Sequence, residues 1–225
     1  MSSSVADAYT SVAELYTEMF VDELSRDTQF IRWLQKFAQF AATQNLPVVD
    51  LGCRPGNAVH HLSELGLDVF GVDLSVGMIE QARRSFSDLV FALGDMRSLG
   101  VADGALGGIV SRHSVIHTKP AELDELFDEW HRVLHGGAPL FMSFFGSRTP
   151  DAHGTPFDHK GETAFELDPE TVGQLLEQSG FVEVEIEAVP ISKGGRLFDH
   201  TTILACASTT GGVTEACGTR TRQRS

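Results

Sequence analysis

The sequence predicts an α/β fold: a doubly wound, mostly parallel sheet of seven strands with helices on both faces. Short apolar runs of strand length alternate with longer stretches of helical spacing from residue 47 to residue 145, and this alternation is typical of consecutive βαβ units. The first run ends in a turn of small residues, the place where α/β sheets bind ligands. The last two runs are expected to form an antiparallel pair at one edge of the sheet.

A helical cap is expected ahead of the sheet, over residues 1–45. Leu15, Met19 and Phe20 recur at helical spacing, and a second helix follows with its apolar residues on one face. The apolar residues of the second helix are Phe30, Ile31, Leu34, Phe37, Ala38 and Ala41. Pro47 ends the helical region because proline lacks the N–H group that a helix interior needs.

A single domain over residues 46–207 is expected to hold the sheet. Its parallel strands are predicted at 47–51, 68–72, 89–93, 108–110 and 138–145, and the helices between them at 56–65, 76–86 and 121–134. Residues 151–160 are polar and contain proline and glycine. This composition favours a surface loop, with a lid over the substrate as the alternative.

The C-terminal part is expected to add one helix and two strands. Asp168 and Pro169 are typical of a helix start, and Gly180 is typical of a helix end. Residues 181–189 alternate apolar and acidic side chains, which predicts a strand with one solvated face, and residues 201–207 form its partner. Residues 208–225 are rich in glycine, threonine and serine without periodicity, so a flexible tail is expected.

Composition and charge exclude several classes of function. The 225 residues are 42% hydrophobic and 21% charged, so the chain can bury a core of ordinary size. The 17 Lys and Arg residues against 31 Asp and Glu residues give a net charge of −14, and a surface this acidic repels a phosphate backbone. No nucleic-acid partner is therefore expected.

The N-terminus and the cysteines bear on the location. The first 20 residues carry acids and no continuous apolar stretch, which does not fit a secretory signal, and no apolar run approaches the roughly 20 residues of a membrane helix. Cys53, Cys206 and Cys217 lack C-x-x-C spacing, so neither a disulfide framework nor a zinc site is expected. The expected location is the cytoplasm, with no membrane partner.

The first strand runs into the most informative loop, which spans residues 50–57. Asp50 places a carboxylate at the strand end, where it suits an ammonium group. Gly52 and Gly56 let the backbone approach a ligand, and Asn57 is expected to cap the next helix. A dinucleotide fingerprint would need glycine where the chain has Arg54 and Asn57, so a nicotinamide cofactor is disfavoured.

Two further carboxylates follow the second and third strands. Asp73, at the tip of the second strand, is placed to accept both hydroxyls of a ribose. Asp95, at the tip of the third strand, is placed to accept an exocyclic amine. Leu74, Met78 and Met96 are candidates to sandwich a flat base.

Four segments in this order and spacing resemble the class I S-adenosylmethionine-dependent methyltransferases. They are DLGCRPG at 50–56, GVDLSVGM at 71–78, GDM at 94–96 and RVLHGG at 132–137, and the resemblance covers residues 48–207. It implies a Rossmann-like fold and S-adenosyl-L-methionine as the cofactor. It also implies that the first loop holds the methionine moiety, Asp73 the ribose, and Asp95 with Met96 the adenine. The residues assigned to the cofactor are Tyr16, Asp50, Leu51, Gly52, Cys53, Gly56, Asp73, Leu74, Met78, Gly94, Asp95, Met96 and Arg112.

Arg54 departs from the family pattern, which usually has a small residue at this position. The expectation is that its side chain points outward. The alternative is that it reaches into the site and pairs with a carboxylate of the cofactor or of an acidic substrate. The family also often has a tyrosine in its N-terminal cap near the cofactor, so Tyr9 or Tyr16 closes the site or simply packs there.

Two histidines follow the fourth strand and are the candidate catalytic residues. His113 and His117 are four residues apart and would share one face of a helix. Histidine is well suited to accept a proton near neutral pH, and the alternative is a packing or solvent role for both. A metal-binding H-E-x-x-H motif would need glutamate where the chain has Ser114, so no metal is expected.

The expected function is transfer of a methyl group from S-adenosylmethionine to a small-molecule acceptor. The alternative is a non-catalytic protein that binds S-adenosylmethionine or S-adenosylhomocysteine as a sensor or regulator. The acceptor pocket is expected to be apolar. Its candidate lining residues are Phe144, Phe145, Phe157 and Phe165.

Overall fold

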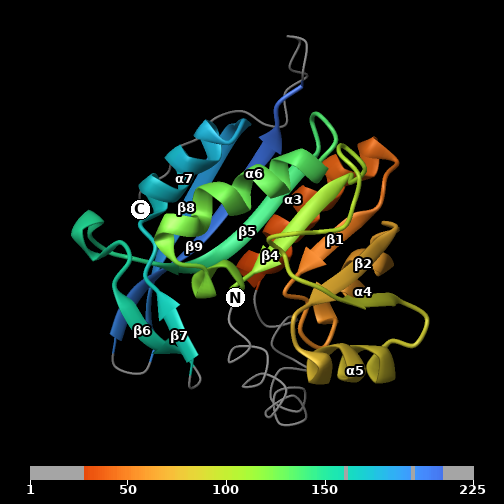
Figure 1. Ribbon diagram of the computed structural model, residues 1–225, viewed down its shortest axis with the longest axis horizontal. Coiled ribbons are helices and arrows are strands. Elements are labelled where there is room, and N and C mark those ends of the chain that lie inside the picture. Colours follow the sequence, from red (N-terminus) through yellow and green to blue (C-terminus); the bar gives the residue numbers. More distant parts are fainter. Residues whose placement is uncertain (1–27, 160–161, 194–195, 210–225) are drawn as a thin grey trace.

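The computed structural model describes residues 28–159, 162–193 and 196–209. A seven-stranded sheet in the order β3-β2-β1-β4-β5-β9-β8 forms its centre (Figure 1). Strands β1 to β5 are mutually parallel, and β9 is antiparallel to both of its neighbours, β5 and β8. The predicted fold class is therefore confirmed, including the antiparallel pair at the edge.

The predicted elements agree with the structure along the first half of the domain. The five parallel strands and the three helices between them lie within two residues of their expected bounds, whereas the last two strands are longer than expected. The strands of the main sheet are β1 Val48–Leu51, β2 Val69–Asp73, β3 Val90–Leu93, β4 Gly108–Arg112, β5 Pro139–Gly146, β8 Phe181–Lys193 and β9 Arg196–Ala207. The helices are α3 Thr28–Gln44, α4 Asn57–Glu64, α5 Val76–Ser85, α6 Leu123–Val133 and α7 Pro169–Gln178, with short 3₁₀ helices at Val115–His117, Pro120–Glu122 and Pro150–Ala152.

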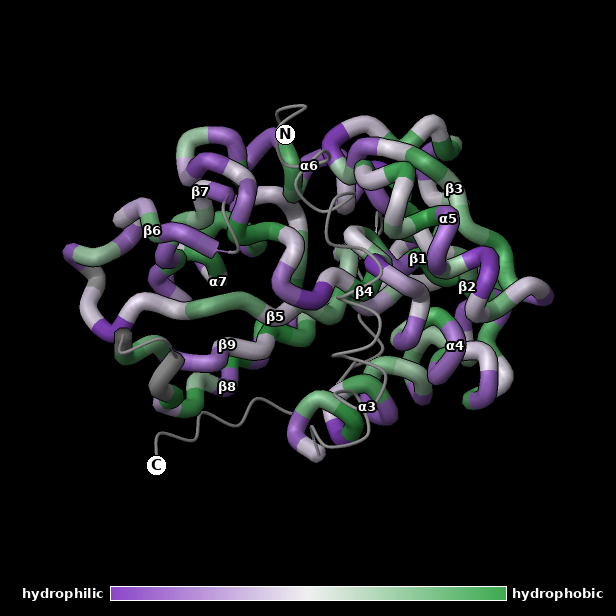
Figure 2. Tube along the Cα trace, turned by 90° about the horizontal axis from the view of Figure 1, so that it is seen from below, coloured by the Kyte–Doolittle hydropathy of each residue, from purple (hydrophilic) through white to green (hydrophobic). Residues whose placement is uncertain are grey.

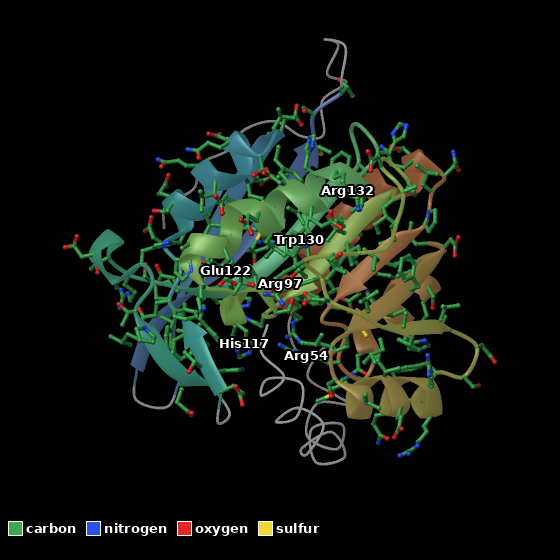
Figure 3. All side chains as sticks on the ribbon, in the orientation of Figure 1. Arg54, Arg97, His117, Glu122, Trp130 and Arg132 are labelled. Atoms are coloured by element: carbon green, nitrogen blue, oxygen red, sulfur yellow. The ribbon has the colours of Figure 1, made fainter. Side chains whose placement is uncertain are left out.

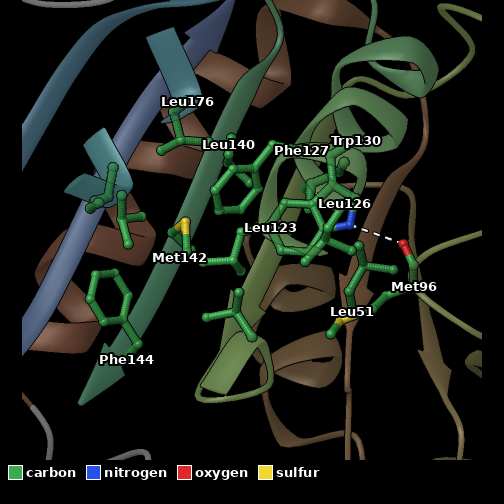
Figure 4. Close-up of a cluster of buried hydrophobic side chains, with 14 of the residues drawn as sticks. Leu51, Met96, Leu123, Leu126, Phe127, Trp130, Leu140, Met142, Phe144 and Leu176 are labelled. Atoms are coloured by element: carbon green, nitrogen blue, oxygen red, sulfur yellow. Dashed lines mark hydrogen bonds between the residues drawn. The ribbon is translucent and has the colours of Figure 1, made fainter. Parts of the chain in front are cut away.

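Two hydrophobic layers hold the helices on the two faces of the sheet. On one face α6 and α7 pack against β1, β4 and β5, with Trp130 and Phe127 completely buried (Figure 4). The indole Nε1 of Trp130 donates a hydrogen bond to the carbonyl oxygen of Met96, 3.1 Å away. On the other face α3, α4 and α5 form the second layer. Helix α3 carries both hydrophobic and hydrophilic residues along its length (Figure 2), because only one of its faces is buried.

Polar caps fix the starts of two helices. The Asp168 carboxylate accepts the backbone N–H of Thr171 at 2.9 Å, and Pro169 occupies the first turn of α7 as predicted. Ser75 caps α5 through the N–H of Met78. The expected cap by Asn57 is wrong: α4 begins at Asn57, and its cap position is Gly56 without a side-chain hydrogen bond.

A β-hairpin replaces the surface loop expected near residues 151–160. Strand β6 (Pro156–His159) pairs with β7 (Glu162–Phe165) in a separate two-stranded sheet. Phe157 and His159 are buried because their rings lie against Phe145, and Phe157 also lies against Phe198. These distant aromatic contacts outweigh the local preference of proline and glycine for a loop.

The acidic face of β8 is covered rather than solvated, contrary to expectation. Glu187 accepts hydrogen bonds from the indole of Trp33 at 2.5 Å, the guanidinium of Arg32 at 2.7 Å and the amide of Gln29 at 2.9 Å. Lys36 forms an ion pair with Glu185, the next acid on this face. Burial acts to raise the pKa of Glu187, but the hydrogen bonds outweigh it and the pKa is lowered. Helix α3 thus docks on β8 through its polar residues.

The remaining expectations concern the cysteines and the chain ends. Cys53 is a buried free thiol, whereas Cys206 is disulfide-bonded. The first part of the helical cap expected over the carboxyl edge of the sheet, with Tyr9 and Tyr16, also lies outside the described residues, as does most of the expected tail. Helix α3, the described part, packs on a face of the sheet instead. None of the helices in the described part is long and apolar enough to cross a membrane.

Candidate functional site

The candidate site lies where the carboxyl ends of β1, β2 and β4 meet. Strand β1 lies between β2 and β4 and runs parallel to both, so the loops that follow the three strands emerge at one edge of the sheet. Arg54 from the loop after β1 and His117 from the segment after β4 both lie at this edge (Figure 3), close enough for the charge of Arg54 to act on His117.

Asp50 is a buried carboxylate near the end of β1. Asp50 is only 2% exposed, and none of the described residues donates a hydrogen bond to its carboxylate. Burial raises the pKa of Asp50 to about 7, against the opposing charges of Arg54 and Arg112 and together with the like charge of Asp73. A largely buried carboxylate to which the described residues donate no hydrogen bond suits a cationic ligand.

Asp73 ends β2 and organises the loops around it. Its Oδ2 accepts the backbone N–H of Arg54 and its Oδ1 that of Ser75, both at 2.9 Å. Burial raises the pKa of Asp73, although these hydrogen bonds act to lower it. A carboxylate has about four lone-pair positions, so Asp73 retains acceptor capacity for further donors such as ribose hydroxyls.

Arg54 reaches into the site, so the expectation that its side chain points outward is wrong. Its Nη2 donates to the carbonyl oxygens of Arg112 at 3.1 Å and His113 at 3.4 Å, which spans the ends of β1 and β4. Its backbone has a φ of 53°, a left-handed conformation that residues other than glycine rarely adopt. The sequence revealed the unusual residue, but its direction depends on carbonyls almost sixty residues away.

The two loop glycines are required by packing as well as by conformation. Gly52 and Gly56 have φ values of 73° and 90°. A Cβ at Gly52 would lie 2.5 Å from the Cβ of Ser114, and one at Gly56 would lie 2.7 Å from the ring of Phe91. Leu51 and Cys53, the other loop residues assigned to the cofactor, are buried. The glycines therefore seat the loop against β3 and the segment after β4.

The third strand places its carboxylate in a local ion pair. Arg97 donates to Asp95 through Nη2 at 2.7 Å and Nε at 3.1 Å. Burial acts to raise the pKa of Asp95, but the contacts with Arg97 outweigh it, and the pKa is lowered. Met78 and Met96 are buried in the protein, which leaves Leu74 as the partly exposed member of the expected base sandwich. Gly94 directly follows β3.

An aromatic cluster surrounds Phe145 at the end of β5. The ring of His113 stacks on Phe145 with centroids 4.6 Å apart, and its Nε2 lies 3.2 Å from the Nε2 of His200 on β9. At this distance the two Nε2 atoms form a hydrogen bond, in which the Nε2 of one histidine carries the proton and donates, and the Nε2 of the other histidine accepts. The ring of His159 lies 5.4 Å from Phe145 on another side. The cluster thus brings together residues of four segments.

His117 occupies a different place from His113. Its Nδ1 lies 3.0 Å from the carbonyl oxygen of Thr163 on β7. The expected common helix face is wrong, because His113 has a left-handed φ of 51° and precedes the 3₁₀ helix that contains His117. Burial lowers the pKa of His117, and the positive charge of Arg54 adds to this effect.

His159 and His200 were polar candidates from the sequence, but their place beside Phe145 was not predicted. His200 lies opposite Phe145 through the β5–β9 register, and no local motif in the sequence indicates this position. Of the expected pocket phenylalanines, Phe144 is completely buried in the core, whereas Phe145 and Phe157 belong to the cluster and Phe165 is half-buried. No group of three metal-ligating side chains occurs in the part of the chain that the structure describes.

Comparisons with known proteins relate this chain to methyltransferases. Residues 48–137 match the family model of the methyltransferase domain. An arsenite methyltransferase of Halobacterium salinarum is 31% identical over 150 residues, which cover 62% of this chain and 38% of that protein. Three curated relatives are matched over only 29% to 41% of their own length.

Solved structures share the fold at low identity. A methyltransferase from Archaeoglobus fulgidus, described as dependent on S-adenosylmethionine, superimposes with a TM-score of 0.65 and 20% identity over 85% of this chain and 98% of that one. The [4+2]-cyclase SpnF superimposes with a TM-score of 0.63 and 16% identity, over 72% of this chain and 75% of that chain. These likenesses show the fold.

Proposed function

We propose that the protein is a class I S-adenosylmethionine-dependent methyltransferase that transfers a methyl group to a small-molecule acceptor, since residues 48–137 match the family model of the methyltransferase domain. The observation that carries the proposal is the pair of buried carboxylates at the ends of β1 and β2. Asp50 lacks a hydrogen-bond donor among the described residues and fits an ammonium group. Asp73 keeps acceptor positions that fit a ribose.

The proposed cofactor residues divide by the end of the ligand that they would hold. Asp50, with the loop from Leu51 to Gly56, serves the amino-acid end, and Asp73 with Leu74 serves the ribose. Gly94 and Asp95 serve the adenine, and Met78 and Met96 support that end from the core. Arg112, whose charge acts on Asp50, also belongs to this set. Tyr16 is proposed as a cofactor residue from the sequence alone, because it lies outside the described residues. The bound cofactor would supply a methyl group on a positively charged sulfur.

The chain's own contribution is to orient the acceptor, exclude water and take up a proton where the acceptor must lose one. We propose that His113 or His117 takes up the proton that the acceptor loses. His113 is held between Phe145 and His200, and the contact with His200 fixes its ring orientation. His117 is anchored on Thr163, and its lowered pKa keeps its imidazole neutral and able to accept a proton at pH 7.

The acceptor is proposed to be a small organic molecule. The aromatic rings around Phe145 are buried against one another and form an apolar wall behind the histidines, and the net charge of −14 disfavours nucleic acid. The cytoplasm stays the proposed location, on the sequence grounds given above.

The second candidate is a protein that binds the cofactor without transferring its methyl group. Two observations favour it: Arg54 extends a cation into the site, and the [4+2]-cyclase SpnF shares the fold, so the fold does not prescribe methyl transfer.

Calorimetric titration with S-adenosylmethionine, S-adenosylhomocysteine and NAD tests the cofactor. We expect micromolar binding of the first two and no binding of NAD, and binding of NAD alone would overturn the proposal. Methyl transfer from labelled cofactor to a panel of small acceptors then separates the two candidates. Turnover supports the enzyme, and cofactor binding without turnover on any acceptor supports the sensor.

A further inference from the structure

A buried carboxylate of β1 and two carbonyl oxygens at the end of β4 provide acceptors for a cation on neighbouring parallel strands. The carboxylate is Asp50, buried and without a hydrogen-bond donor among the described residues. The carbonyls belong to Arg112 and His113. An ammonium group carries three N–H donors and one positive charge, so it would be satisfied by such acceptors.

The cation that meets this arrangement in the structure is Arg54. Its guanidinium donates to both carbonyl oxygens, at 3.1 Å and 3.4 Å. Of the opposing charges that act on Asp50, Arg54 has the largest effect, ahead of Arg112. Arg54 therefore supplies the strongest of the positive charges that act on Asp50, while its guanidinium is held on the two carbonyl oxygens at the end of β4.

The backbone holds Arg54 in this position at a conformational cost. Its left-handed φ of 53° is unfavourable for a side chain with a Cβ, by about 1–2 kcal/mol. The N–H of Arg54 is fixed on the Asp73 carboxylate at 2.9 Å, which keeps the residue at the mouth between β1 and β2. The loop thus directs the guanidinium across the site instead of into solvent.

We propose that Arg54 is a specificity-determining residue of the cofactor site, a resident cation that the ammonium group of the ligand must displace. This inference rests on the proposed function and deepens it. One carboxylate stabilises one cation well, and a second cation beside it is repelled. Arg54 therefore weakens the binding of ligands that carry the amino-acid end and leaves the binding of the nucleoside end unchanged.

The test compares two ligands that differ in the amino-acid end. S-adenosylhomocysteine carries it, and 5′-methylthioadenosine has the nucleoside and the thioether without it. Both are titrated at pH 8 into the wild-type chain and into Arg54→Asn, Arg54→Lys and Arg83→Asn. Asparagine tolerates the left-handed backbone and removes the charge, whereas lysine keeps the charge. Arg83 is the matched control, because its guanidinium also donates to a main-chain carbonyl, that of Phe91, and is not among the charges that act on Asp50.

Arg54→Asn is expected to bind S-adenosylhomocysteine about tenfold more tightly and 5′-methylthioadenosine with an affinity within about twofold of the wild type. Arg54→Lys and Arg83→Asn are expected to keep the wild-type ratio of the two affinities. Circular dichroism and thermal unfolding of each variant establish that it is folded.

Two outcomes overturn the inference alone. Weaker binding of S-adenosylhomocysteine to Arg54→Asn would mean that Arg54 binds the ligand's carboxylate. Equal changes for both ligands would mean that Arg54 only shapes the loop. Failure of both ligands to bind every folded variant and the wild type would remove the proposed function together with this inference.

Discussion

The two halves of the site are assembled in opposite ways. The half at the ends of β1, β2 and β3 takes its carboxylates from three short segments, and each lies within two residues of the end of its strand. The half around Phe145 takes its histidines from distant parts of the chain: the contact between His113 and His200 joins residues 87 positions apart. The difference teaches that the carboxylates at the strand ends are placed by local motifs, whereas the histidines around Phe145 are placed by tertiary packing.

The comparison predicts that the half around Phe145 controls turnover. His113→Ala is expected to lower the turnover number about a hundredfold, because loss of a general base costs at least that much, with cofactor affinity within about twofold of the wild type. His117→Ala is expected to have a smaller effect. Initial rates of methyl transfer and calorimetric titration measure the two quantities. His135→Ala, at an exposed histidine, is the control, and unchanged rates in both site variants would remove histidine from the proton transfer.

The half at the end of β1 is expected to be more sensitive to loop geometry. Gly56→Ala should lower the free energy of unfolding by about 2 kcal/mol, because its Cβ would meet the ring of Phe91 at 2.7 Å. Gly66→Ala is the matched control: Gly66 has a similar φ of 85° but open space around its Cβ direction, so only the backbone strain of about 1 kcal/mol remains. Urea unfolding measures both, and equal losses would contradict the packing argument.

Asp73→Ala tests whether the half of the site at the ends of β1, β2 and β3 controls cofactor affinity. It is expected to weaken binding of S-adenosylhomocysteine by more than tenfold, about 1.4 kcal/mol or more, because a ribose contact is lost. The turnover number at saturating cofactor should change less than the affinity does. Asp88→Ala, on the loop before β3, serves as a control at an exposed acid. Unchanged affinity in Asp73→Ala would exclude the ribose assignment.

The smallest expected effect concerns pH. The pKa of Asp50 is raised to about 7 by burial, so its carboxylate becomes fully ionised only above that pH. Affinity for S-adenosylhomocysteine is expected to increase severalfold between pH 6 and pH 8, because the ammonium group needs the ionised form. Titration at these pH values checks the trend, and Asp50→Asn should show none. The same slope in Asp50→Asn would assign the effect to another group.

The raised pKa also has a consequence for stability, with the opposite sign. The folded protein holds the Asp50 proton up to a higher pH than the unfolded chain does, since the pKa is raised from 3.8 to about 7. Between these values the folded state binds more protons, so this group's contribution to stability falls as pH rises from 4 to 7. Thermal unfolding of the ligand-free wild type and of Asp50→Asn, each from pH 5 to pH 8, measures how the contribution of Asp50 to stability changes with pH.

The sequence predicted the parts of the molecule that local patterns control. The alternation of strands and helices located the sheet, and the acidic residues in the last two positions of β1 and β2 predicted Asp50 and Asp73 as site residues. It did not predict the β6–β7 hairpin, which depends on contacts between Phe157 and rings far along the chain. It also missed the direction of Arg54, which is set by carbonyl groups of another strand. Local propensity contains no information on such contacts.

The docking of α3 on β8 has a consequence for the order of events during synthesis. Trp33 leaves the ribosome early, but Glu187, its polar partner, follows 154 residues later. At roughly 5–20 residues per second, the delay is about 8–30 s. During this time the indole and the neighbouring cations of α3 have no carboxylates to bind. The nascent chain therefore keeps this helix incompletely docked until the last two strands of the sheet emerge.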